Sequence, residues 1–303
     1  MTLIGLDIGG TKIRGVAVNT SGSVLADLTR PTQPGPEGVT AAATSLARDL
    51  LHVAALPARQ LRAVGIGVPG QVDPATGVVR TSVNLAIEEC DLGPRLRAAL
   101  GVPVMLDNDV KAAALGAAEF LDRPDVTLVN IGTGVASATV LEGRLLRGSA
   151  NVAGEIGHIP VDPAGPWCRC GQRGCIEALA GGRQVAERLA VHQPKVSLPT
   201  LVSAAAAGPP AAVDELARVS SAIATAVQVT VLAHGSRCIA LTGGVVHAGV
   251  GLVEAVRETL EQRGAQSAFL ASLALPGRVI LVPATAPIAV LGAVQLAAEA
   301  IAD

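Results

Sequence analysis

One pattern constrains the fold of this chain most: a strand, a glycine turn and a returning strand occur near the start and again near the middle. The first copy covers residues 4–18 and the second covers residues 128–140. A strand–turn–strand pattern of this kind predicts a β-hairpin. Because further strand-like and helix-like segments follow each copy, the repetition predicts two similarly built α/β lobes.

The composition of the chain agrees with a large apolar core. Half of its 303 residues are hydrophobic, 16% are charged and 1% are aromatic. The core must therefore consist of Ala, Val, Leu and Ile. The formal net charge is −2, so the chain lacks the cationic excess that nucleic-acid phosphates reward, and we expect no nucleic-acid partner.

An uncharged run at residues 279–298 is long enough to cross a bilayer. Pro283 and Pro287 interrupt any helix there, so the run instead predicts a short buried strand, a turn and a final helix. The chain starts at its first strand without a signal segment, and its five cysteines are an odd set. We expect a cytoplasmic protein without membrane contact.

A cluster of metal-binding residue types lies between residues 158 and 175. It consists of His158, Cys168, Cys170 and Cys175. Three thiolates and one imidazole suit tetrahedral Zn²⁺, and a closed set of four ligands predicts a structural ion. Gly171 and Gly174 let the loop fold tightly. The alternatives are unrelated thiols or a redox pair at Cys168 and Cys170, and we interpret the distant Cys90 and Cys238 as small buried residues.

Two acidic residues flank this cluster. Glu155 lies three residues before His158, and Glu177 lies two residues after Cys175. An arbitrary pair of glutamates is best interpreted as solvated surface residues. Attachment to one metal loop would instead bring the two carboxylates together, and this arrangement suits hydrogen bonds to several hydroxyl groups.

Glycine-rich turns at three places predict contacts with phosphate groups. They comprise Gly9, Gly10, Thr11 and Lys12, then Gly132, Thr133 and Gly134, and finally Gly243 and Gly244. Backbone N–H groups at such turns can approach phosphate oxygens closely, although a hairpin turn alone has the same composition and none of the turns is a Walker loop. Asp7, at the end of the strand before the first turn, could hold a hydrated Mg²⁺ beside a nucleotide.

The run Asp107-Asn108-Asp109 stands where a strand gives way to an Ala-rich helix. Asn and Asp are common N-cap residues, so helix capping is one interpretation. If the glycine turns bind a nucleoside triphosphate, one of these carboxylates could instead accept the proton of an attacking hydroxyl group, as the catalytic aspartate does in phosphoryl transfer.

Together these segments resemble the ROK family, which includes repressors and kinases. The resemblance runs from residues 6–12 to residues 242–244. Its most specific part is Gly-Glu-Ile-Gly-His at residues 154–158, followed by Cys-x-Cys-Gly-x-x-Gly-Cys-x-Glu at residues 168–177. Residues 65–70 and Asn108-Asp109 fall between these segments in the expected order.

The resemblance implies an α/β fold of the actin-like ATPase type, with two ribonuclease-H-like lobes and a cleft that holds ATP and sugar. We expect the smaller lobe at residues 1–115, with a final helix at about residues 288–303 packing back on it. The larger lobe, with the zinc loop, would cover residues 116–287. The resemblance also implies a homodimer.

Single residues receive roles from the same resemblance, with Asp109 as the catalytic base. The sugar contacts would come from Gly70, Asn84, Asn108, Asp109, Glu155, His158 and Glu177. The ATP and Mg²⁺ contacts would come from Asp7, Gly9, Gly10, Thr11, Lys12, Gly132, Thr133, Gly134, Gly243 and Gly244. The structural zinc ligands would be His158, Cys168, Cys170 and Cys175.

The chain departs from the family pattern at two places. Lys111 occupies a position that is often Asn, where it either changes the charge of the pocket or points to solvent. Residues 136–138, Ala-Ser-Ala, replace a glycine run after the second turn, which bears on the affinity for ATP. No helix-turn-helix precedes the first strand, so we favour a kinase over a transcription factor.

We therefore expect an ATP-dependent, Mg²⁺-requiring hexose kinase, similar to the glucokinases of the family, that phosphorylates the sugar 6-hydroxyl. One alternative is a kinase for an amino sugar, N-acetylglucosamine or N-acetylmannosamine, or for a specialised sugar-like metabolite. Another is a sugar-sensing regulator without turnover, which the change at residues 136–138 would favour. The phosphoryl donor could also be another nucleotide or polyphosphate.

Overall fold

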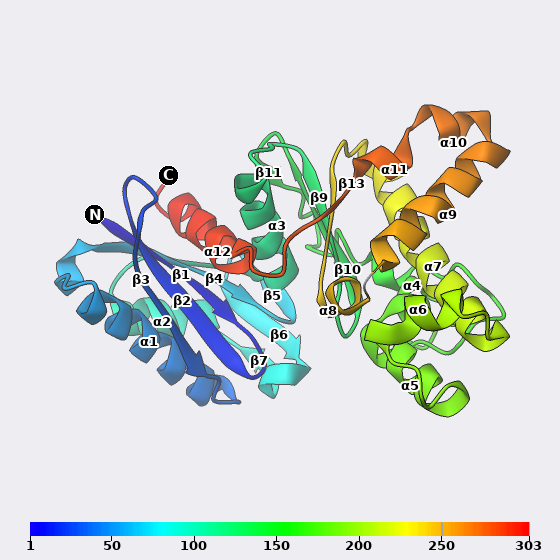
Figure 1. Cartoon of the computed structure of the whole chain (residues 1–303). Helices are drawn as coiled ribbons and strands as arrows, with labels where there is room; N and C mark the ends of the chain where they lie inside the picture. The colour runs from blue at the N-terminus through cyan, green and yellow to red at the C-terminus, as the bar shows by residue number, and fades with distance from the viewer. Residues whose placement is uncertain (250, 303) are drawn as a thin grey trace. The chain divides into compact units, whose positions relative to one another are not determined.

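The computed structural model describes residues 1–249 and 251–302, which form two compact α/β units (Figure 1). Unit 1 comprises residues 1–124, residues 140–151 and the described residues from 287 onward. Unit 2 comprises residues 125–139 and the described part of residues 152–286. The lobe boundaries expected from the sequence, after residues 115 and 287, stay a prediction.

A sheet with the strand order β3-β2-β1-β4-β8 forms the centre of unit 1. Its strands are β1 (Thr2–Ile8), β2 (Lys12–Asn19), β3 (Val24–Pro31), β4 (Leu61–Val68) and β8 (Val104–Asn108). The predicted first hairpin is present, because β1 pairs antiparallel with β2. β1, β4 and β8 run parallel, so their carboxyl ends meet at one edge of the sheet. A smaller sheet contains β5 (Gln71–Asp73), β6 (Val78–Ser82) and β7 (Ile87–Cys90).

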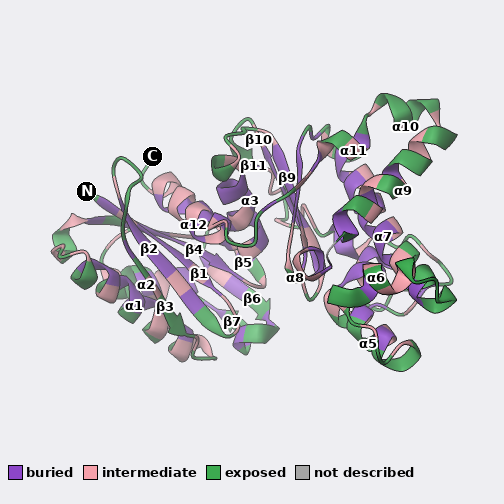
Figure 2. Cartoon of the chain, in the orientation of Figure 1, coloured by how far each residue is buried: buried purple, intermediate pink, exposed green. Residues whose placement is uncertain are grey.

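Helices cover both faces of the first sheet. They are α1 (Pro36–Val53), α2 (Leu92–Leu100), α3 (Asp109–Phe120) and α12 (Ile288–Glu299), with short 3₁₀ turns η1 (Ala58–Gln60) and η2 (Val83–Leu85). Successive strand residues point to opposite faces. Leu6 of β1 accordingly lies beside Leu50 of α1, whereas Gly5 lies against the backbone of α12 at Val290. The sheet is therefore a buried layer between helices (Figure 2).

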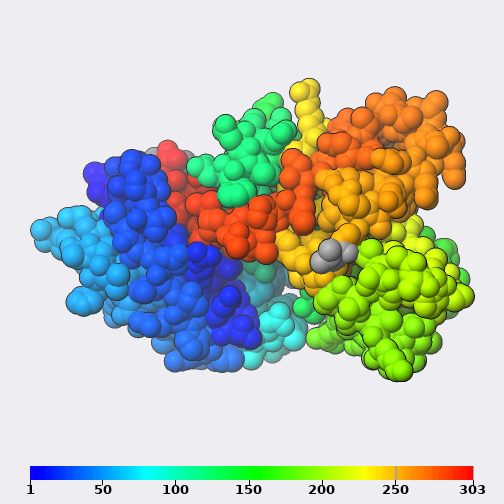
Figure 3. Space-filling model, viewed as in Figure 1, coloured from blue at the N-terminus to red at the C-terminus, as the bar shows by residue number. Residues whose placement is uncertain are grey.

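The C-terminal helix α12 packs on α3 with the two backbones almost in contact. A Cβ at Gly116 would overlap the carbonyl oxygen of Ile288, and a Cβ at Gly292 would overlap that of Ala112. Only glycine leaves room for this approach. α12 also packs against β1, and in Figure 3 the red C-terminal residues lie against the blue N-terminal residues of unit 1.

Gly116→Ala is expected to lower the free energy of unfolding by about 3 kcal/mol, because the added methyl group must displace the backbone of α12. Urea unfolding followed by circular dichroism measures this change. Gly277→Ala is the matched control, since a Cβ there would meet nothing within 4 Å, and the helical α11 should gain up to about 1 kcal/mol from it. Equal effects of the two substitutions would contradict the close packing.

A second five-stranded sheet, with β9, β12 and β13 in unit 2, repeats the arrangement of the first, in the order β11-β10-β9-β12-β13. Its strands are β9 (Val126–Ile131), β10 (Val135–Leu141), β11 (Arg144–Leu145), β12 (Ile239–Thr242) and β13 (Val279–Leu281). The chain passes from unit 2 to unit 1 within β10. β9, β12 and β13 run parallel, as β1, β4 and β8 do. This correspondence, strand for strand, confirms the repeat read from the sequence.

Helices form most of the rest of unit 2. They are η3 (Ile156–His158), α4 (Ile176–Ala180), α5 (Gly182–His192), η4 (Leu198–Thr200), α6 (Leu201–Ala206), α7 (Pro210–His234), α8 (Gly244–Ala248), α9 (Leu252–Gln266), α10 (Ala268–Ser272) and α11 (Leu275–Arg278). Within the described chain, α7 alone is long and apolar enough to cross a membrane by length and composition, and half of its most apolar window is buried. A helix in the core of a folded domain can have the same length, apolar composition and burial. Residues 279–298 form the predicted strand, turn and helix, β13 and α12.

Candidate active-site residues

Two acidic residues lie at the carboxyl ends of β1 and β8 in unit 1. A Cβ at Gly67 would lie 3.6 Å from the Asp109 Cα and 3.9 Å from Asp7 Oδ1, so the two acids flank one glycine. Burial, and then the Asp109 charge, raise the pKa of Asp7 from 3.8 to about 6, although Lys12 and Arg14 oppose the shift. A divalent cation would relieve this repulsion, and carboxylate oxygens are the donors that Mg²⁺ prefers. The acidic pair therefore fits a Mg²⁺ site.

Asn108 is the N-cap of α3. Its Oδ1 accepts hydrogen bonds from the backbone N–H groups of Val110 at 2.9 Å and Lys111 at 3.4 Å. Its Nδ2 donates to the carbonyl oxygen of Gly70 at 3.1 Å. The capping interpretation is thus confirmed for Asn108, and its sugar contact stays a prediction. Asp109 Oδ1 also accepts from the N–H of Val110, at 3.0 Å.

The predicted first phosphate turn lies beside predicted sugar residues in unit 1. A Cβ at Gly10 would lie 3.0 Å from the Cβ of Asn84, so only a small residue fits at the turn. Gly70 has a φ of 111°, which a side chain rarely adopts. Thr11 and Lys12 are exposed on the turn. Unit 1 therefore gathers a glycine turn, amide groups and two carboxylates at one edge of its sheet.

The buried position of Lys111 corrects one of the two interpretations of this departure. Lys111 is 6% exposed, and its Nζ donates to the carbonyl oxygen of Asn151 at 2.5 Å. The ammonium group therefore does not point to solvent, since burial requires such bonds. The sequence could not decide this, because Asn151 lies 40 residues further along the chain.

In unit 2 the second and third glycine turns follow the parallel strands β9 and β12. Gly243 has a φ of 103°, and a Cβ there would overlap the carbonyl oxygen of Ile131 at the end of β9. The second turn is closed by a bond from Gly132 N to Gly134 O, 3.0 Å long. Gly182 N, at the start of α5, donates to Gly132 O at 2.8 Å. The two turns thus share one edge of this sheet.

Glu177 connects the cysteine loop to the second turn, a contact that sequence reasoning missed. Its Oε2 accepts a hydrogen bond from the backbone N–H of Val135 at 3.0 Å. The same oxygen occupies the place that a side chain at Gly134 would need. A partner that is a backbone N–H leaves no signal in the sequence. Glu155, by contrast, is exposed.

The histidine and cysteine cluster has the geometry of a tetrahedral metal site. The ligand atoms of His158, Cys168, Cys170 and Cys175 all lie within 4.8 Å of one another. Cys170 Sγ and Cys175 Sγ are 3.7 Å apart, and so are Cys168 Sγ and His158 Nδ1. Two sulfur atoms at about 2.3 Å from one tetrahedral Zn²⁺ lie about 3.8 Å apart. The four residues therefore fit this ion.

Backbone geometry and charge also suit the loop for a metal ion. Gly171 and Gly174 have φ values of 89° and 65°, so glycine is needed for both turns of the loop. Burial raises the pKa of Cys175 to about 12, whereas a hydrogen bond from the Gln172 side chain lowers that of Cys170 to about 6. Metal binding must therefore displace the Cys175 proton, and the affinity for metal should rise with pH.

Metal removal is expected to unfold this loop and to change the fluorescence of Trp167. Trp167 is 69% exposed, and the Arg173 guanidinium lies over the indole ring, with Arg173 Cζ 5.3 Å from the ring centroid. We expect a chelator to shift this emission and to lower Tm by about 5–10 °C, and Zn²⁺ to restore both. Cys170→Ser should abolish the response, and the matched Cys90→Ser should keep it. Absence of bound metal, with a chelator-resistant Tm, would contradict the structural site.

The Ala-Ser-Ala departure at residues 136–138 contacts the segment before Glu155. Ser137 N and Oγ donate to the carbonyl oxygen of Gly154 at 2.8 and 3.2 Å. Gly154 has a φ of 103°, and a Cβ there would overlap the Ser137 carbonyl oxygen. Ser137 and Ala138 are buried. This strand therefore supports the segment that carries Glu155 and His158.

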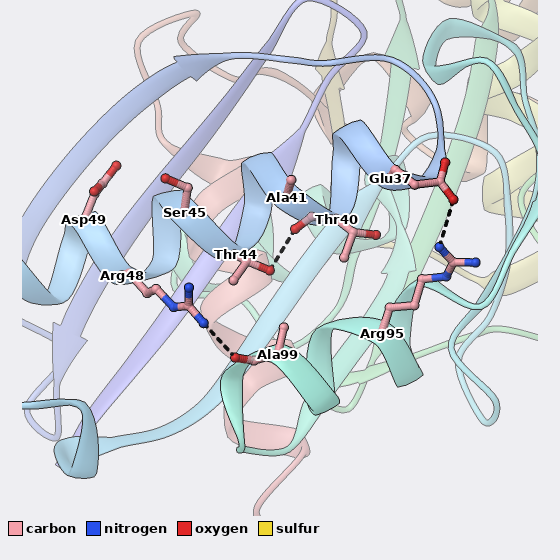
Figure 4. Close-up of a pocket in the computed structure, with 9 residues that line it drawn as sticks. All are labelled: Glu37, Thr40, Ala41, Thr44, Ser45, Arg48, Asp49, Arg95 and Ala99. Carbon is pink, nitrogen blue, oxygen red and sulfur yellow. Dashed lines mark hydrogen bonds and ion pairs between the residues drawn. The ribbon is translucent and has the colours of Figure 1, made fainter.

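A cavity of about 650 Å³ lies between α1 and α2 and contains none of the predicted site residues (Figure 4). Its cations are engaged within unit 1: Arg95 Nη1 lies 3.2 Å from Glu37 Oε1, and Arg48 donates to the Ala99 carbonyl oxygen at 3.1 Å. Figure 4 shows both contacts joining the two helices. The contacts of Arg95 and Arg48 therefore belong to the packing of α1 against α2, and they give this cavity no further role.

These features define an actin-like ATPase fold with two α/β units, the fold of solved ROK sugar kinases. A profile of the ROK family matches residues 3–300. The chain belongs to the ROK family. It is 31% identical over 279 residues to a glucokinase of Thermotoga maritima, covering 85% of this chain and 86% of that protein. It is 32% identical over 277 residues to an N-acetylmannosamine kinase of Citrobacter koseri, covering 88% and 90%.

Solved structures support the same assignment. A ROK hexokinase from Thermus thermophilus superimposes with a TM-score of 0.86 at 30% identity, covering 99% of this chain and 98% of that one. A ROK glucokinase from Streptomyces griseus, in complex with glucose and AMPPNP, has a TM-score of 0.74 at 27% identity and covers 99% and 100%.

Proposed function

We propose that this chain transfers the γ-phosphoryl group of ATP to the 6-hydroxyl of a hexose, with glucose as the preferred substrate and Asp109 as the base. Its membership of the ROK family and its kinase relatives make it an ATP-dependent sugar kinase. The observation that carries the finer proposal is the pairing of Asp109 with Asp7 beside the first glycine turn. Glucose is favoured by the glucokinase relatives.

In the proposed reaction, the Asp109 carboxylate accepts the proton of the sugar 6-hydroxyl. The hydroxyl oxygen then forms a bond to the γ-phosphorus, and the bond from this phosphorus to the β–γ bridging oxygen breaks. ADP leaves with that electron pair. Asp7 would hold Mg²⁺, which neutralises charge on the phosphoryl group when bound. The bond from Val110 N to Asp109 Oδ1, 3.0 Å long, fixes the direction of the base.

The phosphates would be bound by backbone N–H groups of the three glycine turns. These turns are Gly9, Gly10, Thr11 and Lys12; Gly132, Thr133 and Gly134; and Gly243 and Gly244. A Cβ at Gly244 would meet nothing within 4 Å, so its backbone has space around it. Glu177 contributes to this function as well, because it holds the N–H of Val135 directly after the second turn.

We assign the contacts with sugar hydroxyl groups to Gly70, Asn84, Asn108, Asp109, Glu155, His158 and Glu177. His158 Nδ1 faces Cys168 Sγ at 3.7 Å, so metal ligation through Nδ1 would leave Nε2 for a hydroxyl group and fix the ring orientation. Structural Zn²⁺ would make this loop rigid before the sugar binds.

A substrate panel tests this proposal. Purified protein with Mg²⁺ and ATP should form ADP with glucose at a higher kcat/KM than with mannose, N-acetylglucosamine, N-acetylmannosamine or a cyclitol. The Citrobacter koseri relative favours one competing outcome, preference for N-acetylmannosamine. Polyphosphate and other nucleotides as donors test the role of ATP. Sugar binding without any turnover would instead indicate a sensing protein and refute the kinase proposal.

We also propose that the protein acts as a cytoplasmic homodimer, on the basis of its family resemblance. A near-neutral surface with a formal charge of −2 is compatible with this. Light scattering coupled to gel filtration should give a mass of about twice the 30.3 kDa of one chain, and a monomer at micromolar concentration would contradict it.

A further inference from the structure

A buried ion pair includes the residue two positions before the proposed base. Asp107, the residue before Asn108, is fully buried, and its Oδ2 accepts a hydrogen bond from Arg147 Nε at 2.7 Å. The other oxygen, Oδ1, accepts from the backbone N–H of Asn108 at 2.8 Å. Arg147 in turn reaches Glu299, at the end of α12, through Nη2 at 3.2 Å. A continuous chain of contacts therefore runs from α12 to the residue that caps α3.

A second cation ties the same segment to α3. The segment of residues 146–151 follows β11 and ends at Asn151, the residue after which the chain enters unit 2. Lys111, two residues after Asp109, donates from Nζ to the carbonyl oxygen of Asn151 at 2.5 Å. Arg147 holds the start of this segment and Lys111 holds its end. Asp107, which binds Arg147, lies two residues before the proposed base, and Lys111 lies two residues after it.

We propose that Arg147 and Lys111 are positioning residues that hold the Asn108–Asp109 pair in its reactive place. This inference rests on the proposed role of Asp109 as base. Asp107 transmits the effect of Arg147, because one of its oxygens binds the guanidinium and the other binds the backbone N–H of Asn108. Without the guanidinium, the carboxylate would turn, and the Asn108 backbone would shift with it.

A role in positioning Asn108 and Asp109 explains the buried Asp107–Arg147 ion pair better than a role in stability does. A buried ion pair often contributes little to stability compared with apolar side chains of the same size. Asp107 is nevertheless fully buried in β8, and its charge is buried with it. A displacement of a catalytic group by about 1 Å can lower the rate about 100-fold. The charges are therefore placed where a small displacement has a large effect on rate.

Variants of the two positioning residues test the proposal through steady-state kinetics, with Tm as a check on folding. Arg147→Gln and Lys111→Met should each lower kcat about 10- to 100-fold, while KM for glucose and ATP stays within about threefold. A residue that acted only on stability would move Tm and leave the kcat of the folded protein unchanged. Arg30→Gln, which removes an exposed arginine 3.3 Å from Asp49, is the matched control with wild-type kcat.

A double variant protects the test against misfolding. Arg147→Gln alone leaves the Asp107 carboxylate buried without its partner, whereas Asp107→Asn with Arg147→Gln removes both charges and should fold. A folded double variant with kcat within about threefold of wild type would overturn the role of Arg147. If the double variant does not fold, Lys111→Met decides by the same criterion.

Asp109→Asn separates this inference from the proposed function. Full turnover of that variant would refute the base role of Asp109, on which the positioning depends. Loss of turnover in Asp109→Asn, with normal kcat in the Arg147 and Lys111 variants, would refute the positioning alone.

Discussion

Asp109→Asn is expected to lower kcat by about 10²- to 10⁴-fold, the contribution of a positioned general base. The fold should survive, because an Asn at this position can still accept the hydrogen bond that Asp109 Oδ1 receives from Val110 N. The amide cannot take up the proton of the sugar hydroxyl at neutral pH. Glucose and nucleotide affinities should therefore stay close to those of the wild type, and the loss should fall on kcat.

Stopped assays of ADP formation and calorimetric titration with glucose measure the two halves of this expectation. Asp49→Asn makes the same chemical change in the same unit at an exposed aspartate beside Arg30, and it should leave kcat unchanged. Near-normal turnover of Asp109→Asn would remove Asp109 from the base role. A parallel loss of glucose affinity would indicate that Asp109 acts mainly by binding the sugar.

Elements with local causes could be predicted from the sequence. The hairpin at residues 4–18 follows from two apolar strands joined by a glycine turn, and the repeat at residues 128–140 follows in the same way. The boundary at the Asp107-Asn108-Asp109 run is less local. Asp107 and Asn108 belong to β8, because pairing with β4 continues through both residues. Strand pairing therefore extended an element that propensity alone would have ended.

Contacts between distant segments account for most of what sequence reasoning missed in the fold. Gly116 and Gly292 form the contact between α3 and α12, although each by itself reads as an ordinary small residue in an Ala-rich helix. The requirement for glycine at both positions comes from the backbone of another helix, far away along the chain. The final helix was expected to pack back on the first lobe, but nothing in its sequence indicated a backbone-to-backbone contact.

The same distinction holds for the candidate site. The cysteine loop was predictable because Cys168, Cys170 and Cys175 lie within eight residues, a spacing that predicts a set of metal ligands. The bond of Arg147 to Asp107 joins residues 40 positions apart. It could be found only after β8 and the segment after β11 were placed together. Side-chain clusters close in sequence were therefore visible, and the groups that support them were not.

Asp7→Asn is expected to lower turnover at least about 100-fold and, at the same time, to stabilise the folded protein at neutral pH. Asp7 is the proposed Mg²⁺ residue, and loss of an electrostatic contact to the reacting groups has an effect of this size. The gain in stability arises because the Asp7 carboxylate is buried near Asp109, which raises its pKa from 3.8 to about 6. An amide in the same place carries no charge to be repelled.

The sign of the pH dependence follows from that shift. The folded chain holds the Asp7 proton more tightly than the unfolded chain does, so the free energy of unfolding falls as the pH rises from about 4 to about 6. The rise of the Asp7 pKa from 3.8 to about 6 corresponds to about 3 kcal/mol of destabilisation of the folded chain, and this destabilisation is fully present above pH 6. Asp7→Asn should remove most of this penalty at pH 7.5 and change little at pH 4.

Urea unfolding at pH 4 and pH 7.5 measures the difference, without added Mg²⁺. Asp73→Asn is the contrasting control. A hydrogen bond from the Thr76 hydroxyl lowers the pKa of Asp73, so its charge stabilises the folded chain at neutral pH, and its loss should act in the opposite direction. If Asp7→Asn lowered stability at pH 7.5 as Asp73→Asn does, the Asp7 carboxylate would be stabilised by its surroundings. The repulsion between Asp7 and Asp109, which supports the Mg²⁺ site, would then be refuted.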